Sequence, residues 1–177
     1  MTILNIHGYN GSSENAAYVA LKELGHKVVS PQIDYDSSDA DKIFKAVSDL
    51  YTYAKPDLIV GTSFGGFFAC LLSAVYNVPS VAVNPCLKPF EILPNLGYTH
   101  DIRNLIGLFG NLKSIQNDNI SAIVGGQDEI IGSHDFTRLL LGNERYRVIP
   151  DGKHSGSTLP LNEYFAECIS YYEDGNE

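Results

Sequence analysis

Short, uninterrupted apolar runs alternate along this chain with longer segments in which apolar residues recur every three or four positions. A run of four or five apolar residues is typical of a strand buried on both faces, and the longer spacing is typical of an amphipathic helix. The pattern predicts strands at 2–6, 27–30, 57–61, 80–83, 121–124 and 146–149, and helices at 14–24, 39–53, 65–76, 133–141 and 159–172. Strand followed by helix, repeated, requires right-handed crossovers and therefore predicts a parallel sheet in an α/β protein.

The stretch 86–119 is longer than a single crossover requires, and apolar residues and glycines are spread through it. Two interpretations stay open. It forms a cap over a site, or it forms a pair of ordinary helices packed on the sheet. The glycines would permit a cap to move. A cap predicts an apolar pocket, for which Phe90 and Leu93 are candidate lining residues together with Asn84 at the end of its strand.

The most informative motif lies between an expected strand and an expected helix. Gly61-Thr62-Ser63-Phe64-Gly65 has the form G-x-S-x-G and follows the apolar run 58–60 directly. At a sharp strand-to-helix turn the serine is strained and its hydroxyl is exposed above the sheet edge. The bare pattern is also common as a simple glycine-rich loop, so the position of a histidine and a carboxylate decides its meaning.

Both follow, each just past the end of an expected strand. Asp128 comes after strand 121–124, and His154 comes after strand 146–149. The carboxyl ends of parallel strands share one edge of the sheet, where open α/β proteins build their sites. The order Ser63, Asp128, His154 is that of the α/β-hydrolases. Glu129 and Asp151 compete as the acid, but Asp151 would share one tight loop with His154.

An oxyanion hole needs two converging backbone N–H groups. The residue after the nucleophile, Phe64, supplies one, and Tyr9 is the candidate for the other because it follows the first strand in the loop that begins at His7 and Gly8. We expect His7 to orient this loop through a hydrogen bond. His100 and His134 follow no strand end, so neither is expected in the site.

The chain resembles the α/β-hydrolase superfamily over nearly its whole length. Within it, the chain is most similar to the YqiA/YcfP-type small bacterial esterases, on three stretches, at 6–9, 61–66 and 83–91. The resemblance implies a six-stranded sheet in the order 2-1-3-4-5-6 with helices on both faces. It also implies carboxylester hydrolysis without a cofactor, with Ser63 as nucleophile, Asp128 as acid and His154 as base.

Composition adds several exclusions. A chain of 177 residues suits one domain over 1–177, and 44% hydrophobic content is that of a globular protein. The net charge of −9 argues against nucleic acid as a partner. Three scattered cysteines predict neither a metal site nor a disulfide framework and fit reduced thiols in a cytoplasmic protein. No signal peptide and no membrane span are expected.

The sequence therefore predicts a serine hydrolase that cleaves esters of small or medium acyl groups, as a monomer or homodimer. Two alternatives remain: a thioesterase or peptidase on the same residues, and a binding protein that retains the fold without activity. The complete set of candidate residues argues against the second, because a decayed site usually loses a member.

Overall fold

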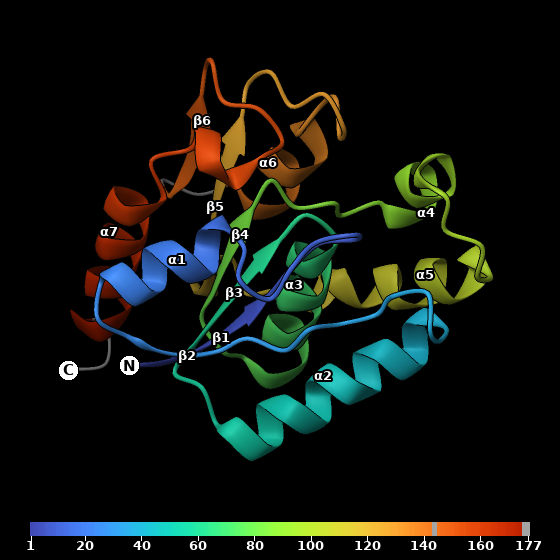
Figure 1. The fold of residues 1–177 in the computed structure, drawn as a ribbon, viewed down its shortest axis with the longest axis horizontal. Coiled ribbons are helices and arrows are strands. Elements are labelled where there is room, and N and C mark those ends of the chain that lie inside the picture. Colours follow the sequence, from blue (N-terminus) through green and yellow to red (C-terminus); the bar gives the residue numbers. More distant parts are fainter. Residues whose placement is uncertain (143–144, 175–177) are drawn as a thin grey trace.

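The computed structural model describes residues 1–142 and 145–174, which form one six-stranded sheet with helices on both faces (Figure 1). The strands are β1 (Thr2–Ile6), β2 (Lys27–Val29), β3 (Leu58–Thr62), β4 (Ser80–Val83), β5 (Ile120–Gly125) and β6 (Tyr146–Ile149). All neighbouring pairs are parallel, and the order is β2-β1-β3-β4-β5-β6. The predicted order and direction of the strands are confirmed.

Side chains of successive strand residues point to opposite faces of the sheet, and the two faces are covered by different helices. Leu58 and Val60 of β3 belong to a core under α1 (Ala16–Glu23) and α7 (Leu161–Asp174), whereas Ile59 belongs to the core on the other face. That second core is closed by α2 (Ala40–Ala54), α3 (Phe64–Tyr76), α5 (Ile102–Phe109) and α6 (Asp135–Leu141). Both faces are apolar, which explains why the strands read as continuous apolar runs.

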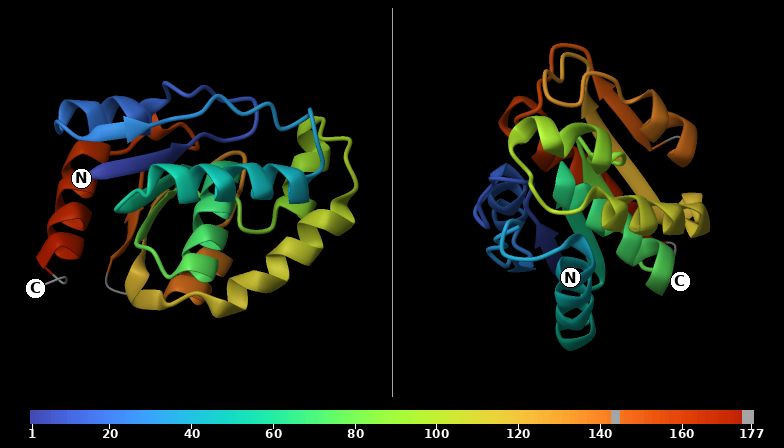
Figure 2. Two further views of the ribbon diagram at one scale, coloured as in Figure 1. Left: turned by 90° about the horizontal axis from the view of Figure 1, so that it is seen from below. Right: turned by 90° about the vertical axis from the view of Figure 1, so that its right-hand side faces the viewer.

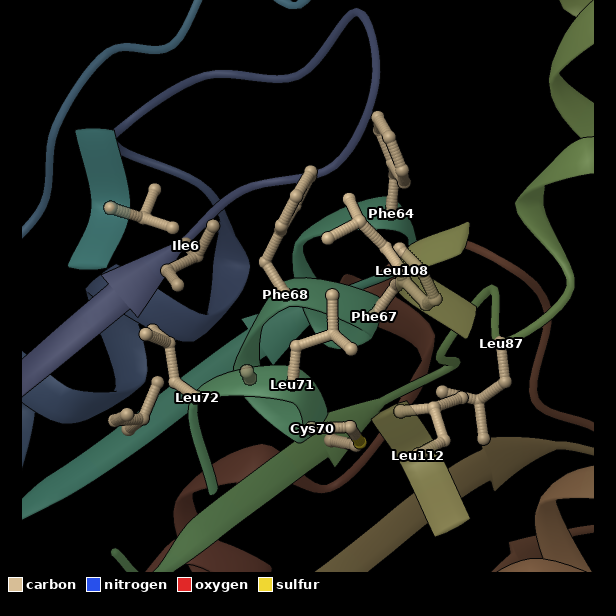
Figure 3. Close-up of a cluster of buried hydrophobic side chains, with 14 of the residues drawn as sticks. Ile6, Phe64, Phe67, Phe68, Cys70, Leu71, Leu72, Leu87, Leu108 and Leu112 are labelled. Atoms are coloured by element: carbon tan, nitrogen blue, oxygen red, sulfur yellow. The ribbon is translucent and has the colours of Figure 1, made fainter. Parts of the chain in front are cut away.

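Helix α3 is the most deeply buried helix of the fold. Every residue from Phe64 to Ser73 is buried, including both glycines that follow Phe64. Figure 3 shows the side chains of Phe67, Phe68 and Leu71 packed in the core beside the sheet. This burial fixes the amino end of α3 firmly against the end of β3.

The segment 86–119 contains α4 (Pro89–Ile92), α5 and three short 3₁₀ helices, η1 (Leu93–Leu96), η2 (Gly110–Ser114) and η3 (Asn117–Asn119). Leu105, Leu108 and Leu112 are buried in the core that α3 closes, and Figure 3 shows the last two among its side chains. In Figure 2, α5 runs beside α2 in the same layer of helices. The part from 102 to 114 is therefore a layer of the core, and α4 with η1 is the part that rises beyond the sheet edge.

All expected helices are present, with ends that differ from the expectation by no more than two residues. None of the helices in the described ranges has the length and apolar character needed to cross a membrane. The remaining helix, η4 (Gly156–Thr158), follows the loop after β6. The thiols of Cys70, Cys86 and Cys168 are free and buried.

Candidate active site

Ser63 occupies the turn between β3 and α3 in a strained backbone conformation, with φ 54° and ψ −119°. Hydrogen bonds from neighbouring chain hold it there: the Ser63 amide donates to Val83 O, and the Cys86 amide donates to Ser63 O, both at 2.9 Å. A Cβ on Gly65 would overlap the carbonyl oxygen of Ile6, and one on Gly61 would overlap that of Gly65. The two glycines of the motif are thus required by close backbone approach.

The three side chains that the sequence singled out lie in one hydrogen-bonded row. Ser63 Oγ is 3.0 Å from His154 Nε2, and His154 Nδ1 is 3.0 Å and 2.9 Å from the two carboxylate oxygens of Asp128. An ionised carboxylate only accepts, so Nδ1 carries the proton and Nε2 is free to accept from the serine hydroxyl. This is the tautomer that a histidine base needs.

Asp128 is buried, and its carboxylate is surrounded by donors. Besides His154, His134 Nε2 lies 2.9 Å from Oδ2, and the amides of Ile130 and Ile131 donate to Oδ1 at 2.9 Å. Burial by itself raises the pKa of a carboxyl group. At Asp128 the hydrogen bonds from the two histidines and the Ile131 amide outweigh burial, so the pKa lies well below its usual range. The carboxylate therefore stays ionised around neutral pH.

Glu129 and Asp151, the other candidates for the acid, make different contacts. Glu129 accepts a hydrogen bond from the backbone amide of His154 at 3.1 Å, and Asp151 accepts one from Gln127 at 3.4 Å. Among the described residues neither carboxylate is hydrogen-bonded to the His154 ring. Glu129 thus supports the loop that carries His154 without reaching the imidazole.

The side chain of Asn84 does not lie on a pocket wall, where it was expected. Its side chain is fully buried, donates to the carbonyl oxygens of Lys153 and His154 at 2.9 Å, and accepts from the Gly125 amide at 2.7 Å. Its backbone has φ 43°, a left-handed conformation that asparagine tolerates. The amide group is fully used in tying the His154 loop to the ends of β4 and β5.

The loop after β1 brings the Gly8–Tyr9 peptide beside the serine. A Cβ on Gly8 would lie 2.9 Å from Ser63 Cβ and 3.5 Å from Ser63 Oγ. The Gly8 carbonyl accepts from His7 Nδ1 at 2.7 Å and from the Gly11 amide at 3.0 Å. In a planar trans peptide the N–H points opposite to the C=O, so these bonds fix the direction of the Tyr9 amide.

His7 has the structural place that was expected for it. It is buried, and its Nε2 accepts from the Ile33 amide at 2.9 Å while Nδ1 donates to the Gly8 carbonyl. Burial lowers the pKa of His7, and the Gly8 hydrogen bond opposes that only in part. The neutral ring suits this arrangement, because protonation would remove the acceptor for Ile33.

Two donors can therefore face one point near Ser63 Oγ. The Phe64 amide lies at the amino end of α3, where helix N–H groups have no partner within the helix. Over residues 1–142 and 145–174, neither the Tyr9 nor the Phe64 amide is engaged in a backbone hydrogen bond outside its own element. The side chain of Tyr9 is anchored separately, by donation from its hydroxyl to the Asp36 carboxylate at 2.9 Å.

A hollow of about 260 Å³ lies next to the serine turn. Pro85 and Cys86 line it on one side, where the Cys86 amide contacts Ser63 O, and Ile131 and Ser133 line it on the other. The rest of its lining comes from α4, the two residues before it, and the first turn of α6: Leu87, Lys88, Glu91, Ile92, Asp135, Phe136 and Thr137. We call this space the α4–α6 hollow.

Phe90 and Leu93 do not line the α4–α6 hollow. Leu93 is 1% exposed within the core, and Phe90 packs against that core and edge-on to Phe109, with ring centroids 5.3 Å apart. Residues three apart lie on the same side of a helical turn, so both face inward while Glu91 and Ile92 face the hollow. Of the residues of α4, Glu91 and Ile92 are the ones that line the hollow.

His134 is the contact that sequence reasoning missed. His134 directly precedes α6 and lies six residues after Asp128. The turn between them is closed by a hydrogen bond from the Gly132 amide to Asp128 O. That short separation is the only signal in the sequence that could have indicated the contact. No group of three or more His, Cys, Asp or Glu side chains in the described ranges is arranged to hold a metal ion.

Comparisons with known proteins agree with this architecture. The model of the family described as "Uncharacterised protein family (UPF0227)" matches residues 2–105, more than half of the chain. A protein of Xanthomonas campestris pv. campestris, described as a hydrolase of the α/β superfamily, superposes with a TM-score of 0.67 at 16% identity, covering 96% of this chain and 98% of its own.

Two further solved structures are similar over most of their length. One, from work on the metagenome-derived lipolytic enzymes LipS and LipT, has a TM-score of 0.69 at 14% identity and covers 96% of this chain and 93% of its own. The other, a carboxylesterase of the thaumarchaeon Nitrososphaera gargenis, has a TM-score of 0.63 at 13% identity, with 96% and 89% covered. These likenesses show that the chain has the α/β-hydrolase fold.

Proposed function

This chain belongs to the uncharacterised family UPF0227 and has the α/β-hydrolase fold, and from that premise we propose that it is a serine hydrolase that cleaves carboxylic esters of small or medium acyl groups. The observation that carries the proposal is the row from Ser63 Oγ to His154 Nε2 and from His154 Nδ1 to Asp128, with all three contacts between 2.9 and 3.0 Å. The lipolytic enzyme and the carboxylesterase among the similar structures support the same class of reaction.

The chemistry is a two-step acyl transfer. His154 Nε2 takes the proton of Ser63, and Oγ attacks the ester carbonyl carbon. The resulting oxyanion accepts from the amides of Tyr9 and Phe64, and each such donor contributes about 10²–10³ to the rate. His154 then gives its proton to the departing alcohol oxygen, which leaves an acyl group on Ser63.

Water completes the cycle. His154 takes a proton from the entering water, whose oxygen attacks the acyl carbonyl, and Ser63 leaves with that proton as the free acid is released. Asp128 accepts throughout from Nδ1, so it holds the ring orientation and stabilises the imidazolium that forms in both steps. Its lowered pKa suits this role, because the carboxylate stays charged while the histidine gains and loses its proton.

The α4–α6 hollow supports the proposed substrate size. Its volume of about 260 Å³ is below the range of about 300–1,000 Å³ typical of drug-sized ligands. Neither Ser63 nor His154 lines it. Its link to the serine turn is Cys86, whose amide donates to Ser63 O, and it carries apolar side chains such as Leu87 and Ile92. We infer that it receives the acyl group. Asn84 takes no part in lining it and instead braces the His154 loop.

Labelling with a fluorophosphonate probe tests the nucleophile. Wild type should label and hydrolyse 4-nitrophenyl butyrate, and Ser63→Ala should lose labelling and at least about 10⁴-fold in kcat. Ser114→Ala is the matched control, since Ser114 is exposed in η2, beside Asn77 and Asn119 at the opposite edge of the sheet. Labelling of Ser63→Ala at the wild-type rate would refute the assignment.

A substrate series then tests the class of ester. Activity on 4-nitrophenyl esters should fall by at least about tenfold from butyrate to palmitate, because a long chain exceeds the hollow. Faster turnover of an acyl thioester or a peptide than of the matched ester would replace the proposed substrate class. Folded wild type that neither labels nor turns over any of these would favour a binding protein with this fold.

A further inference from the structure

Asp128 is held by two histidines, and only one of them faces Ser63. Its side chain is fully buried, and each oxygen has two donors or more within reach. His154 lies on the side of the nucleophile. His134, whose side chain is 5% exposed, approaches Oδ2 from the side of α6.

The hydrogen bonds define the state of the His134 ring. Because the ionised Asp128 carboxylate only accepts, Nε2 of His134 must carry a proton. Nδ1 of His134 is buried and has no hydrogen-bond partner among the described residues. A doubly protonated ring would bury an unpaired N–H, which is costly, whereas the neutral ring buries only a lone pair there. The geometry therefore favours a neutral Nε2–H donor.

A neutral donor at this place has a chemical consequence. It disperses the charge of Asp128 without adding a positive charge that would compete with His154. It also restrains the carboxylate together with the amides of Ile130 and Ile131, so that both oxygens stay within 3.0 Å of His154 Nδ1. With His154 these make four donor groups, which restrain the carboxylate from rotating away when the imidazolium forms.

We propose that His134 is a positioning residue of the candidate active site, which donates through Nε2 to Asp128 and thereby sets the orientation and the basicity of His154. This inference rests on the proposed serine hydrolase function. The row of interacting groups extends from Ser63 through His154 and Asp128 to His134, and its last member does not touch the substrate.

Two substitutions of matched size separate a hydrogen-bonding role from a packing role. In His134→Gln the amide nitrogen reaches about as far as Nε2 and can donate to Asp128. In His134→Met a side chain of similar length fills the same space without a donor. Near-ultraviolet circular dichroism and the thermal midpoint of both variants show whether the fold is kept.

The kinetic prediction concerns the pH profile as well as the rate. Without the donor, the charge of Asp128 is concentrated on His154, and the imidazolium is stabilised. In His134→Met the acid limb of kcat/KM should move to higher pH by about 0.5–1 unit, and kcat should fall about 10- to 100-fold with little change in KM. His134→Gln should stay within about threefold of wild type with its acid limb in place.

The other ionisable groups near Asp128 and residue 134 are the same in both variants. Burial, with Asp128 and Glu91 nearby, raises the pKa of the Cys86 thiol to about 12, so Cys86 does not titrate in the range used. Ionisable groups on contacting or adjacent residues of the described chain include Glu129, which accepts from the His154 amide, and Tyr146, whose hydroxyl donates to the His134 carbonyl. On α6 they include Asp135, next to His134, and Arg138, whose amide donates to the His134 carbonyl. A shift seen in His134→Met and absent in His134→Gln cannot come from them.

A readout that needs no turnover separates this inference from the proposed function. The His154 ring is titrated by proton NMR in wild type and in both variants. Its titration should move up in His134→Met and remain in place in His134→Gln, whether or not an ester is cleaved. An unmoved titration in His134→Met, or equal shifts in both variants, would overturn the positioning role even if wild type is an active esterase.

The wild-type protein provides a second test that does not depend on a variant folding. Nitrogen-15 NMR should show His134 as a neutral ring with its proton on Nε2 from about pH 6 to 8. A proton on Nδ1 with Nε2 bare, or a charged ring throughout that range, would contradict the inference. Absence of turnover together with the expected His134 spectrum would refute the hydrolase proposal alone.

Discussion

Ser63 is held in a backbone conformation that costs about 1–3 kcal/mol relative to an ordinary one. The surroundings compensate for this locally, because the residue's amide and carbonyl both have partners in β4 or the chain after it. The strain places the hydroxyl at the amino end of a helix and 3.0 Å from His154. The G-x-S-x-G pattern showed where this conformation was needed, and the two glycines are explained by specific backbone contacts.

Asn84 shows how a residue can serve a site without facing it. Its amide satisfies three buried backbone groups that belong to the chain around His154 and to Gly125. Alanine at this position would leave these three backbone groups without their partner. It would also be less stable than asparagine in the left-handed backbone conformation. This role depends on tertiary contacts, so no sequence pattern indicates it beyond the position of Asn84 at the end of a strand.

Replacement of Asn84 by alanine should lower the free energy of unfolding by about 2–4 kcal/mol, because buried polar groups lose their partners. Asn10→Ala is the matched control, since Asn10 is exposed and has a similar left-handed φ of 57°. It should cost only about 1 kcal/mol. Urea denaturation measures both values. Equal losses would mean that the Asn84 hydrogen bonds contribute nothing beyond backbone strain.

At the scale of elements, the segment 86–119 combines two kinds of structure. Helix α5 and η2 contribute buried leucines to the core beside α3, and α4 borders the α4–α6 hollow. The sequence left a cap and an ordinary layer as alternatives. Core packing accounts for the apolar spacing of 102–114, so the predicted mobile cap is limited to the part around α4. That mobility stays a prediction.

Two substitutions on adjacent positions of α5 test the core assignment. Leu105 is fully buried, and Leu105→Ala should lower the free energy of unfolding by about 2–4 kcal/mol. Ile106 is 48% exposed, and Ile106→Ala should cost less than about 1 kcal/mol. Thermal or urea unfolding supplies the comparison. A cap that opens independently of the core would give small and similar losses at both positions.

At the scale of the whole molecule, the net charge of −9 is spread over a small domain. The described surface includes acidic side chains close to the site, among them Glu91 and Asp135 in the lining of the α4–α6 hollow, with Lys88 as the cationic member of that lining. The Lys88 ammonium lies over the Phe136 ring and 3.7 Å from Glu91. Anionic substrates should therefore be repelled at low ionic strength.

Ionic strength provides the corresponding test. The kcat/KM for an ester with a carboxylate in its acyl group, such as a 4-nitrophenyl hemisuccinate, should rise about two- to fivefold from about 10 to 300 mM salt as the charges are screened. The neutral 4-nitrophenyl butyrate is the control and should change little. A fall in kcat/KM for the anionic ester with added salt would instead indicate local attraction by Lys88.

The sequence alone determined the succession of elements and their parallel arrangement, because both depend on short-range apolar periodicity and on the handedness of the crossovers. It also located Ser63, Asp128 and His154 at strand ends, since one edge of a parallel sheet collects the ends of all its strands. These inferences need only the succession of strands along the chain, and they need no knowledge of side-chain contacts.

Only the tertiary structure decided which side chains meet at that edge. It turned Phe90 and Leu93 into the core, buried Asn84 under the His154 loop, and brought His134 onto Asp128 from the turn before α6. Each of these depends on the phase of a short helix or the path of a loop, which no periodic pattern specifies. Contacts between distant residues arise from packing, and packing is set by the whole chain at once.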